Sequence, residues 1–154
     1  VIDWNARFTA LAEQVNLDRT PLPNEPNGKA WGGYAGLSLR LANFSDRKAA
    51  TDSGPAIFNP QDRYRGKHAA FEYNGKLDDQ DVGIAVRGFD SNLNAPSPWY
   101  SIRSKVMSFF TPAVICYGAH EMQRGDRFTL RYSIHIHPER WDSNTLKSLL
   151  SGSL

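Results

Sequence analysis

The stretch Arg127–His137, RFTLRYSIHIH, is the clearest strand in the sequence and decides the expected fold class. Apolar and polar residues alternate along it, and successive side chains of a strand point to opposite faces of a sheet. This alternation predicts a half-buried strand with one face against a core. The apolar face would carry Phe128, Leu130, Tyr132, Ile134 and Ile136, and the polar face Thr129, Arg131, Ser133, His135 and His137.

Strand patterns of the same kind recur along most of the chain. The opening residues alternate in the same way from Ile2 to Ala10. Short strands are further predicted over 14–18, 31–41, 68–73, 81–89, 99–103 and 105–110, with Asn74-Gly75 as a tight hairpin turn and residues 43–65 as a polar surface excursion with about one short strand. About nine short strands predict an antiparallel β-sandwich or supersandwich, all-β in class.

The last thirteen positions, 142–154, follow a different period. Leu146, Leu149 and Leu150 are spaced as on one face of a helix, behind a possible cap at Asp142 or Ser143. We therefore expect a short terminal helix and a frayed tail on a single domain spanning residues 1–154. Because the chain begins in mid-strand, we also expect it to be a fragment or half of a larger domain. Exposed sheet edges would then favour pairing with a missing N-terminal half or self-association.

Composition excludes several classes of protein. Of 154 residues, 40% are hydrophobic and 22% charged, as in globular domains. No apolar run approaches the roughly 20 residues that a bilayer requires, which predicts no membrane span. A net charge of +2 is too small to suggest nucleic acid. The single cysteine, Cys116, excludes an internal disulfide but leaves the compartment open, periplasmic or cytoplasmic.

Several motifs together resemble the bacterial family described as methane oxygenase PmoA-like, a domain of unknown function. They are the opening Val1-Ile2-Asp3-Trp4, the run Gly32-Gly33-Tyr34-Ala35-Gly36-Leu37, the strand Val82-Gly83-Ile84-Ala85-Val86, Ser91-Asn92 followed by Pro96-Ser97-Pro98-Trp99, and Gly125-Asp126 before Leu130-Arg131-Tyr132 with His137. The resemblance covers most of this chain but only the C-terminal half of a full family member. It implies a galactose-mutarotase-like supersandwich and a role in carbohydrate use rather than methane oxidation.

The chain departs from the family pattern at three polar positions. Members usually read Asp-His-Pro before the Ser-Asn pair, where this chain has Gly88-Phe89-Asp90. An arginine usual after the Asn-Pro step is Asn94 here, and a histidine usual after the tryptophan is Tyr100. The resemblance therefore leaves room for a lost or altered activity.

Candidate catalytic residues come from the polar strand faces. A glycosidase or epimerase needs an acid and a base on opposite sides of the sugar. We expect His137 and Glu72 to supply acid–base groups, with Arg131 beside them on a concave sheet face. Their alternatives are a solvent-facing histidine at a strand end, a solvated carboxylate, and a surface arginine whose stem covers apolar area.

Substrate-binding residues are expected at loops and polar strand faces. Arg40 has the planar fork that suits hydroxyls or a uronate carboxylate. Tyr34 and Trp99 are candidates for stacking on a sugar ring, and Asp90 and Asn92 for its hydroxyls. For Trp4 and Trp31 core packing is the expectation.

His135 and His137 raise a separate possibility, because they lie two positions apart on one strand. Same-face neighbours are about 6.6–7 Å apart, so both imidazoles could hold one transition metal. No other cofactor is expected. The sequence thus supports three hypotheses: a saccharide-processing protein that uses acid–base chemistry, a non-catalytic carbohydrate-binding or assembly module, and a metal-dependent oxidoreductase.

Overall fold

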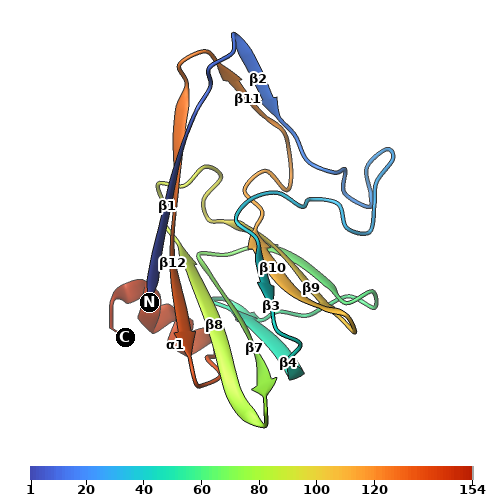
Figure 1. Cartoon of the computed structure of the whole chain (residues 1–154), viewed down its shortest axis with the longest axis vertical. Helices are drawn as coiled ribbons and strands as arrows, with labels where there is room; N and C mark the ends of the chain where they lie inside the picture. The colour runs from blue at the N-terminus through green and yellow to red at the C-terminus, as the bar shows by residue number, and fades with distance from the viewer. Residues whose placement is uncertain (154) are drawn as a thin grey trace.

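The computed structural model describes residues 1–153, and Leu154, the last residue of the expected tail, lies outside them. Figure 1 shows two facing sheets and a short helix at the C-terminal end. All strand pairs within residues 1–153 are antiparallel, which confirms the predicted all-β sandwich. No helix of residues 1–153 has the length and apolar character needed to cross a bilayer.

The large sheet has six strands. The strand formed by Arg127–His137, β12, lies next to the edge strand β1 (Ile2–Thr9). The order of this sheet is β1, β12, β8 (Gln80–Gly88), β7 (Ala70–Leu77), β4 (Ser45–Thr51) and β5 (Gly54–Pro55). The second sheet has the order β3 (Leu39–Leu41), β10 (Met107–Pro112), β9 (Pro98–Ser104) and β6 (Arg63–Lys67). A small ribbon joins β2 (Gln14–Leu17) to β11 (His120–Gln123).

The main core fills the space between the two sheets. Leu130, Tyr132 and Ile134 are buried on the face of β12 that the alternation predicts to be apolar. The ring of Phe71 lies 5.3 Å from that of Trp99 and 5.4 Å from that of Phe110, so aromatic contacts join β7 to β9 and β10. Stacked or tilted rings at this spacing add to the free energy gained by burial.

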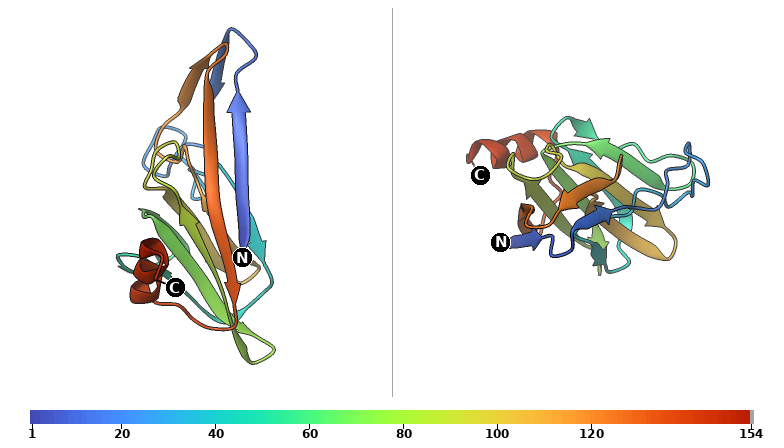
Figure 2. Two further views of the ribbon diagram at one scale, coloured as in Figure 1. Left: turned by 90° about the vertical axis from the view of Figure 1, so that its left-hand side faces the viewer. Right: turned by 90° about the horizontal axis from the view of Figure 1, so that it is seen from above.

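The paired strands β1 and β12 extend past the second sheet, as the side view in Figure 2 shows. At their far end the β2–β11 ribbon folds over, so apolar residues there have no second sheet to cover them. Phe8 and Phe128 stack on each other at 4.7 Å instead, and Phe8 remains 41% exposed. This overhang shapes the cleft described below.

The outer face of the large sheet carries the helix α1 (Ser143–Ser151). Three alanines with small side chains, Ala50, Ala70 and Ala85, lie on neighbouring strands of this face. Leu146 and Leu149 of the helix pack against them. The Asp142 carboxylate accepts hydrogen bonds from the backbone N–H groups of Asn144 and Thr145, at 3.0 and 2.9 Å. The predicted helix is therefore confirmed, with Asp142 as its N-cap.

Two predictions about local structure were wrong. The strand expected over 31–41 is reduced to β3, because Gly33 and Gly36 have φ of +80° and +125° and interrupt the extended backbone. Asn74-Gly75 lies inside β7, and the hairpin turns instead at Asp78-Asp79, both with positive φ. Gly75 serves close packing there, because a Cβ atom would meet Phe44 Cβ and Ser45 O at 2.7 Å.

The polar segment 43–65 also contains more structure than predicted. It holds β4, β5 and the start of β6, and the buried part of β4 is the short run Ala49–Thr51. β11 was not predicted, because its HEMQ sequence carries little strand signal, and its pairing with β2 places it. Tertiary pairing overrides weak local preference in both places.

Candidate functional site

A cleft of about 470 Å³ lies beneath the overhanging pair of strands β1 and β12. Aromatic side chains of Trp4, Phe8 and Phe128, on β1 and β12, line it on one side. Asn16 and Asp18, on and just after β2, bring polar groups to its rim. The loop segments 35–37 and 114–115 close the opposite wall. Apolar walls with a few polar groups at this volume are typical of small-molecule sites.

The predicted acid–base pair, Glu72 and His137, does meet. Glu72 on β7 is completely buried, and its Oε2 lies 3.2 Å from Nε2 of His137 at the end of β12. Gly83 on β8 lies between them, since it pairs with His137 on one side and Asn74 on the other. A Cβ at Gly83 would collide with His137 Cε1 and Glu72 Oε1. The absent side chain is what lets the two groups touch across the middle strand.

Trp141 closes this pair off from the surface. Its ring lies flat on the His137 imidazole, with centroids 3.8 Å apart and planes 5° from parallel. Burial raises the pKa of the Glu72 carboxyl, although the hydrogen bond with His137 opposes this shift. The site is therefore a covered, desolvated carboxyl–imidazole pair, and it does not line the cleft.

Arg131 lies away from that pair. It is six residues before His137 on the same face of β12, which corresponds to about 20 Å along the strand. Its guanidinium carbon is 4.7 Å from the centroid of Phe89, and that of Arg87 is 5.1 Å from the same ring. Phe89, one of the departures from the family pattern, thus serves as a platform for two arginines.

Asn92 supports the backbone of that region. Its Nδ2 donates to Arg131 O at 2.8 Å, and its Oδ1 accepts from Arg131 N at 2.7 Å. The buried amide therefore pairs with β12 as another strand would and pins the loop between β8 and β9. Asp90, on the same loop, is exposed.

The other predicted binding residues do not converge. Trp99 is completely buried and its indole N–H donates to His68 O at 2.9 Å, so it packs in the core. Tyr34 is exposed and stacks on Phe109 at 5.2 Å. Arg40 is exposed on β3 of the second sheet, whereas Arg131 lies on β12 of the large sheet. Trp31, expected in the core, is 56% exposed.

The His135–His137 pair offers a metal little support. Nε2 of His135 lies 3.0 Å from Ser133 Oγ, and Nε2 of His137 faces Glu72. Burial lowers the pKa of His135. Within residues 1–153, no group of three or more His, Cys, Asp or Glu side chains is arranged to hold a metal ion.

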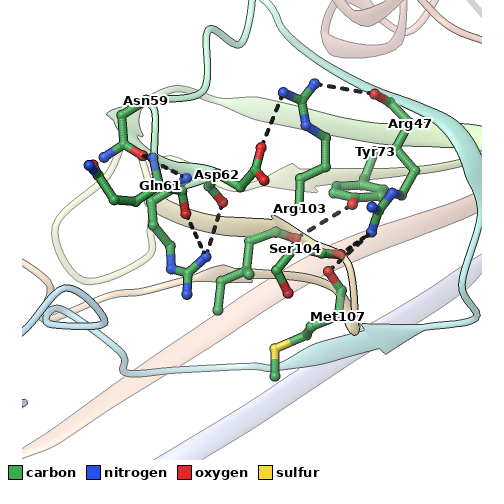
Figure 3. Close-up of polar contacts among 10 residues, drawn as sticks. Arg47, Asn59, Gln61, Asp62, Tyr73, Arg103, Ser104 and Met107 are labelled. Carbon is green, nitrogen blue, oxygen red and sulfur yellow. Dashed lines mark hydrogen bonds and ion pairs between the residues drawn. The ribbon is translucent and has the colours of Figure 1, made fainter.

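Two further arginines hold the fold together (Figure 3). Arg47 Nη1 donates to Ser104 O at 2.7 Å and to Met107 O at 3.3 Å, which ties β4 to the turn between β9 and β10. Arg103 Nη1 donates to Arg47 O and its Nη2 lies 3.4 Å from Asp62 Oδ1. These side chains are occupied by the protein itself and are not candidates for a ligand.

The cleft residues are those that sequence reasoning missed. Trp4 was assigned to the core, and it does pack against the core cluster while one side faces the cleft. Phe8 and Phe128 were recognised only as strand-face residues. The available signal was the length of the alternating stretch Arg127–His137, whose 11 residues exceed every other described strand.

The fold and the cleft together define an antiparallel β-sandwich domain with an aromatic-lined cleft beside its edge strand. The chain belongs to a family of unknown function, DUF6807, whose profile matches residues 1–151. Comparison with curated proteins and with solved structures gives no match.

Proposed function

We propose that this protein binds a saccharide in the cleft lined by Trp4, Phe8 and Phe128. The observation that carries the proposal is the combination of aromatic walls with Asn16 and Asp18 at the rim. Sugar rings present apolar C–H faces and hydroxyl edges, so they suit a site with aromatic faces and a few amide or carboxylate groups. The resemblance to the PmoA-like family and its galactose-mutarotase-like relatives supports the same ligand class.

The geometry favours binding over catalysis at this cleft. Asp18 is the only acidic residue among those that line it, and its Oδ1 already lies 3.6 Å from Nη1 of Arg19, which is not itself a lining residue. A glycoside hydrolase needs two carboxyl groups placed about the scissile bond. The non-catalytic carbohydrate-binding hypothesis is therefore the one we advance for the cleft.

A panel of neutral mono- and oligosaccharides, titrated while indole and amide resonances are followed, tests this function. Trp4→Ala should weaken binding roughly tenfold or more, since it removes one aromatic wall. Trp31→Ala is the matched control, because Trp31 is exposed and outside the cleft. Asn16→Ala, an exposed change, should weaken binding without affecting thermal unfolding. The proposal would be contradicted if no saccharide bound, or if saccharides shifted only the indole resonance of Trp31.

A second candidate function is proton transfer on a saccharide by Glu72 and His137. A carboxyl with a raised pKa in contact with an imidazole is typical of acid–base sites. Substrate access would require Trp141 to leave the imidazole face. Proton exchange or cleavage on glycosides that Trp141→Ala accelerates and Glu72→Gln abolishes would support this candidate.

A further inference from the structure

The first strand of the large sheet has an open edge. β1 contains eight residues and pairs only with β12, so its other side meets no strand within residues 1–153 (Figures 1 and 2). The opposite edge of the same sheet is protected, since β5 is two residues long and ends in Pro55. Short strands and prolines are the usual means of blocking edge-to-edge pairing. β1 has neither.

The hydrogen bonds at the end of β1 show which backbone groups face this open edge. Ala10 N donates to Asp126 O at 3.0 Å, and Ala10 O accepts from Gly125 N at 2.9 Å. Ala10 therefore directs its backbone groups toward the β12 side. In an antiparallel strand this direction alternates with each residue. Asp3, Asn5 and Arg7 accordingly direct their N–H and C=O groups toward the open edge.

Asp3 and Arg7 lie at equal distances from Asn5 along β1. Two antiparallel copies of β1 can therefore bring opposite charges together. We propose that two copies of this chain pair through β1 in antiparallel fashion, with Asn5 on the two-fold axis and Asp3 opposite the partner's Arg7. The large sheets of the two copies then form one continuous sheet. Neither Asp3 nor Arg7 makes an ion pair within residues 1–153, so both charges are available.

Backbone geometry restricts the possible registers. Only residues whose backbone groups face the edge can form hydrogen-bonded pairs, so odd-numbered positions must oppose odd-numbered positions. The register centred on Asn5 brings two Asp–Arg pairs together, one on each side of the axis. Registers centred on Asp3 or Arg7 would place like charges directly opposite, which is destabilising.

The apolar face of β1 fits the same register. Ile2, which is 52% exposed, would lie opposite the partner's Phe8, which is 41% exposed in the single chain. Trp4 would lie opposite the partner's Ala6, a large residue beside a small one. Pairing would therefore cover exposed apolar surface as well as backbone groups. Trp4 and Phe8 also line the cleft, but the pairing depends on the open edge and requires no ligand.

Charge reversal tests the register. Analytical ultracentrifugation of the full chain over a wide concentration range should show a monomer–dimer equilibrium. Asp3→Arg alone and Arg7→Asp alone should each raise the dimer dissociation constant by about tenfold or more. The combined D3R/R7D variant restores both pairs and should return the constant to near its original value. Glu13→Arg, an exposed charge change outside β1, is the matched control.

A crosslink provides a second measurement that does not depend on charge. Opposed residues of a hydrogen-bonded pair have Cα atoms about 5.5 Å apart, within the range of a disulfide. Asn5→Cys should therefore form a covalent dimer under mild oxidation, whereas Arg127→Cys should not. The native Cys116 is buried and should not interfere. A chain that stays monomeric, a dimer unaffected by either single reversal, or a double variant that fails to recover would overturn the proposal.

Discussion

Nε2 of His137 lies 3.2 Å from Oε2 of Glu72, across a middle strand that carries no side chain at Gly83. The contact joins residues 65 positions apart, and Trp141 stacks over it. One proton between the two atoms completes the hydrogen bond, whether the carboxyl or the imidazole holds it. A buried polar pair of this kind makes stability depend on pH and on exact packing, and both dependences can be measured.

Glu72→Gln should flatten the pH dependence of unfolding. The folded-state pKa of Glu72 is raised above its ordinary value of 4.5, chiefly by burial, so the folded chain holds this proton more tightly than the unfolded chain. Its contribution to stability is complete below pH 4.5 and is lost as pH rises through the folded-state pKa. Urea unfolding of the variant from acid to neutral pH should lack this decline. Glu13→Gln, an exposed change, should keep it, and an unchanged slope in Glu72→Gln would refute the assignment.

Gly83→Ala should destabilise the fold by about 2–3 kcal/mol, because a new Cβ has no room in this layer. The added atom would meet His137 and Glu72 side-chain atoms, and Glu139 O at 2.7 Å. Gly118→Ala is the matched control, since nothing lies within 4 Å of its Cβ position. Denaturant midpoints give the difference. Equal effects of the two substitutions would show that Gly83 is not required for close approach.

Asn92→Ala should cost about 2 kcal/mol, because two hydrogen bonds with the Arg131 backbone are lost and the freed groups are partly buried. Ser91→Ala, at the exposed neighbouring position, should have almost no effect. Amide hydrogen exchange of residues 89–98 should accelerate in the first variant alone. Unchanged protection of this loop would mean that other contacts hold it.

Asp142→Ala should lower the melting temperature at neutral pH by removing the cap of α1. The pKa of Asp142 is lowered below 3.8, chiefly because its carboxylate accepts a hydrogen bond from the Thr145 backbone N–H. Its stabilising effect is therefore present above pH 3.8 and is lost as pH falls through the lower folded-state value. Asp142→Asn keeps a capping oxygen and should melt near the original temperature while losing the acid-range dependence. A melting temperature that neither change alters would contradict the role of this cap.

The prediction of strands succeeded where periodicity was strong. β12 matched the alternating stretch Arg127–His137 in full, and Ile2–Thr9 matched the opening pattern almost to its ends. Long alternating stretches carry a signal in every residue, and each side chain has a definite face. Prediction failed at Gly75 and in segment 43–65, where a neighbouring strand decides the structure.

Candidate site residues followed a similar division. The sequence showed that Glu72 and His137 lie on polar strand faces, and the structure brings them together through the register of β7, β8 and β12. Arg131 was expected beside them but lies about 20 Å away along its strand. Trp99 was expected at a binding surface and is buried. Alternation in the sequence shows which face of a sheet a side chain is on. It does not show how far apart two side chains lie or whether other residues bury them.

The all-β class, the two faces of β12 and the capped terminal helix could be predicted from the sequence, because they depend on the local period of apolar residues and on nearby capping groups. The folded arrangement alone reveals that Trp141 covers His137, that strands β1 and β12 overhang a cleft and that β1 has an open edge. Those features depend on which strands pair and in which register, and pairing is set by contacts between residues far apart in the chain.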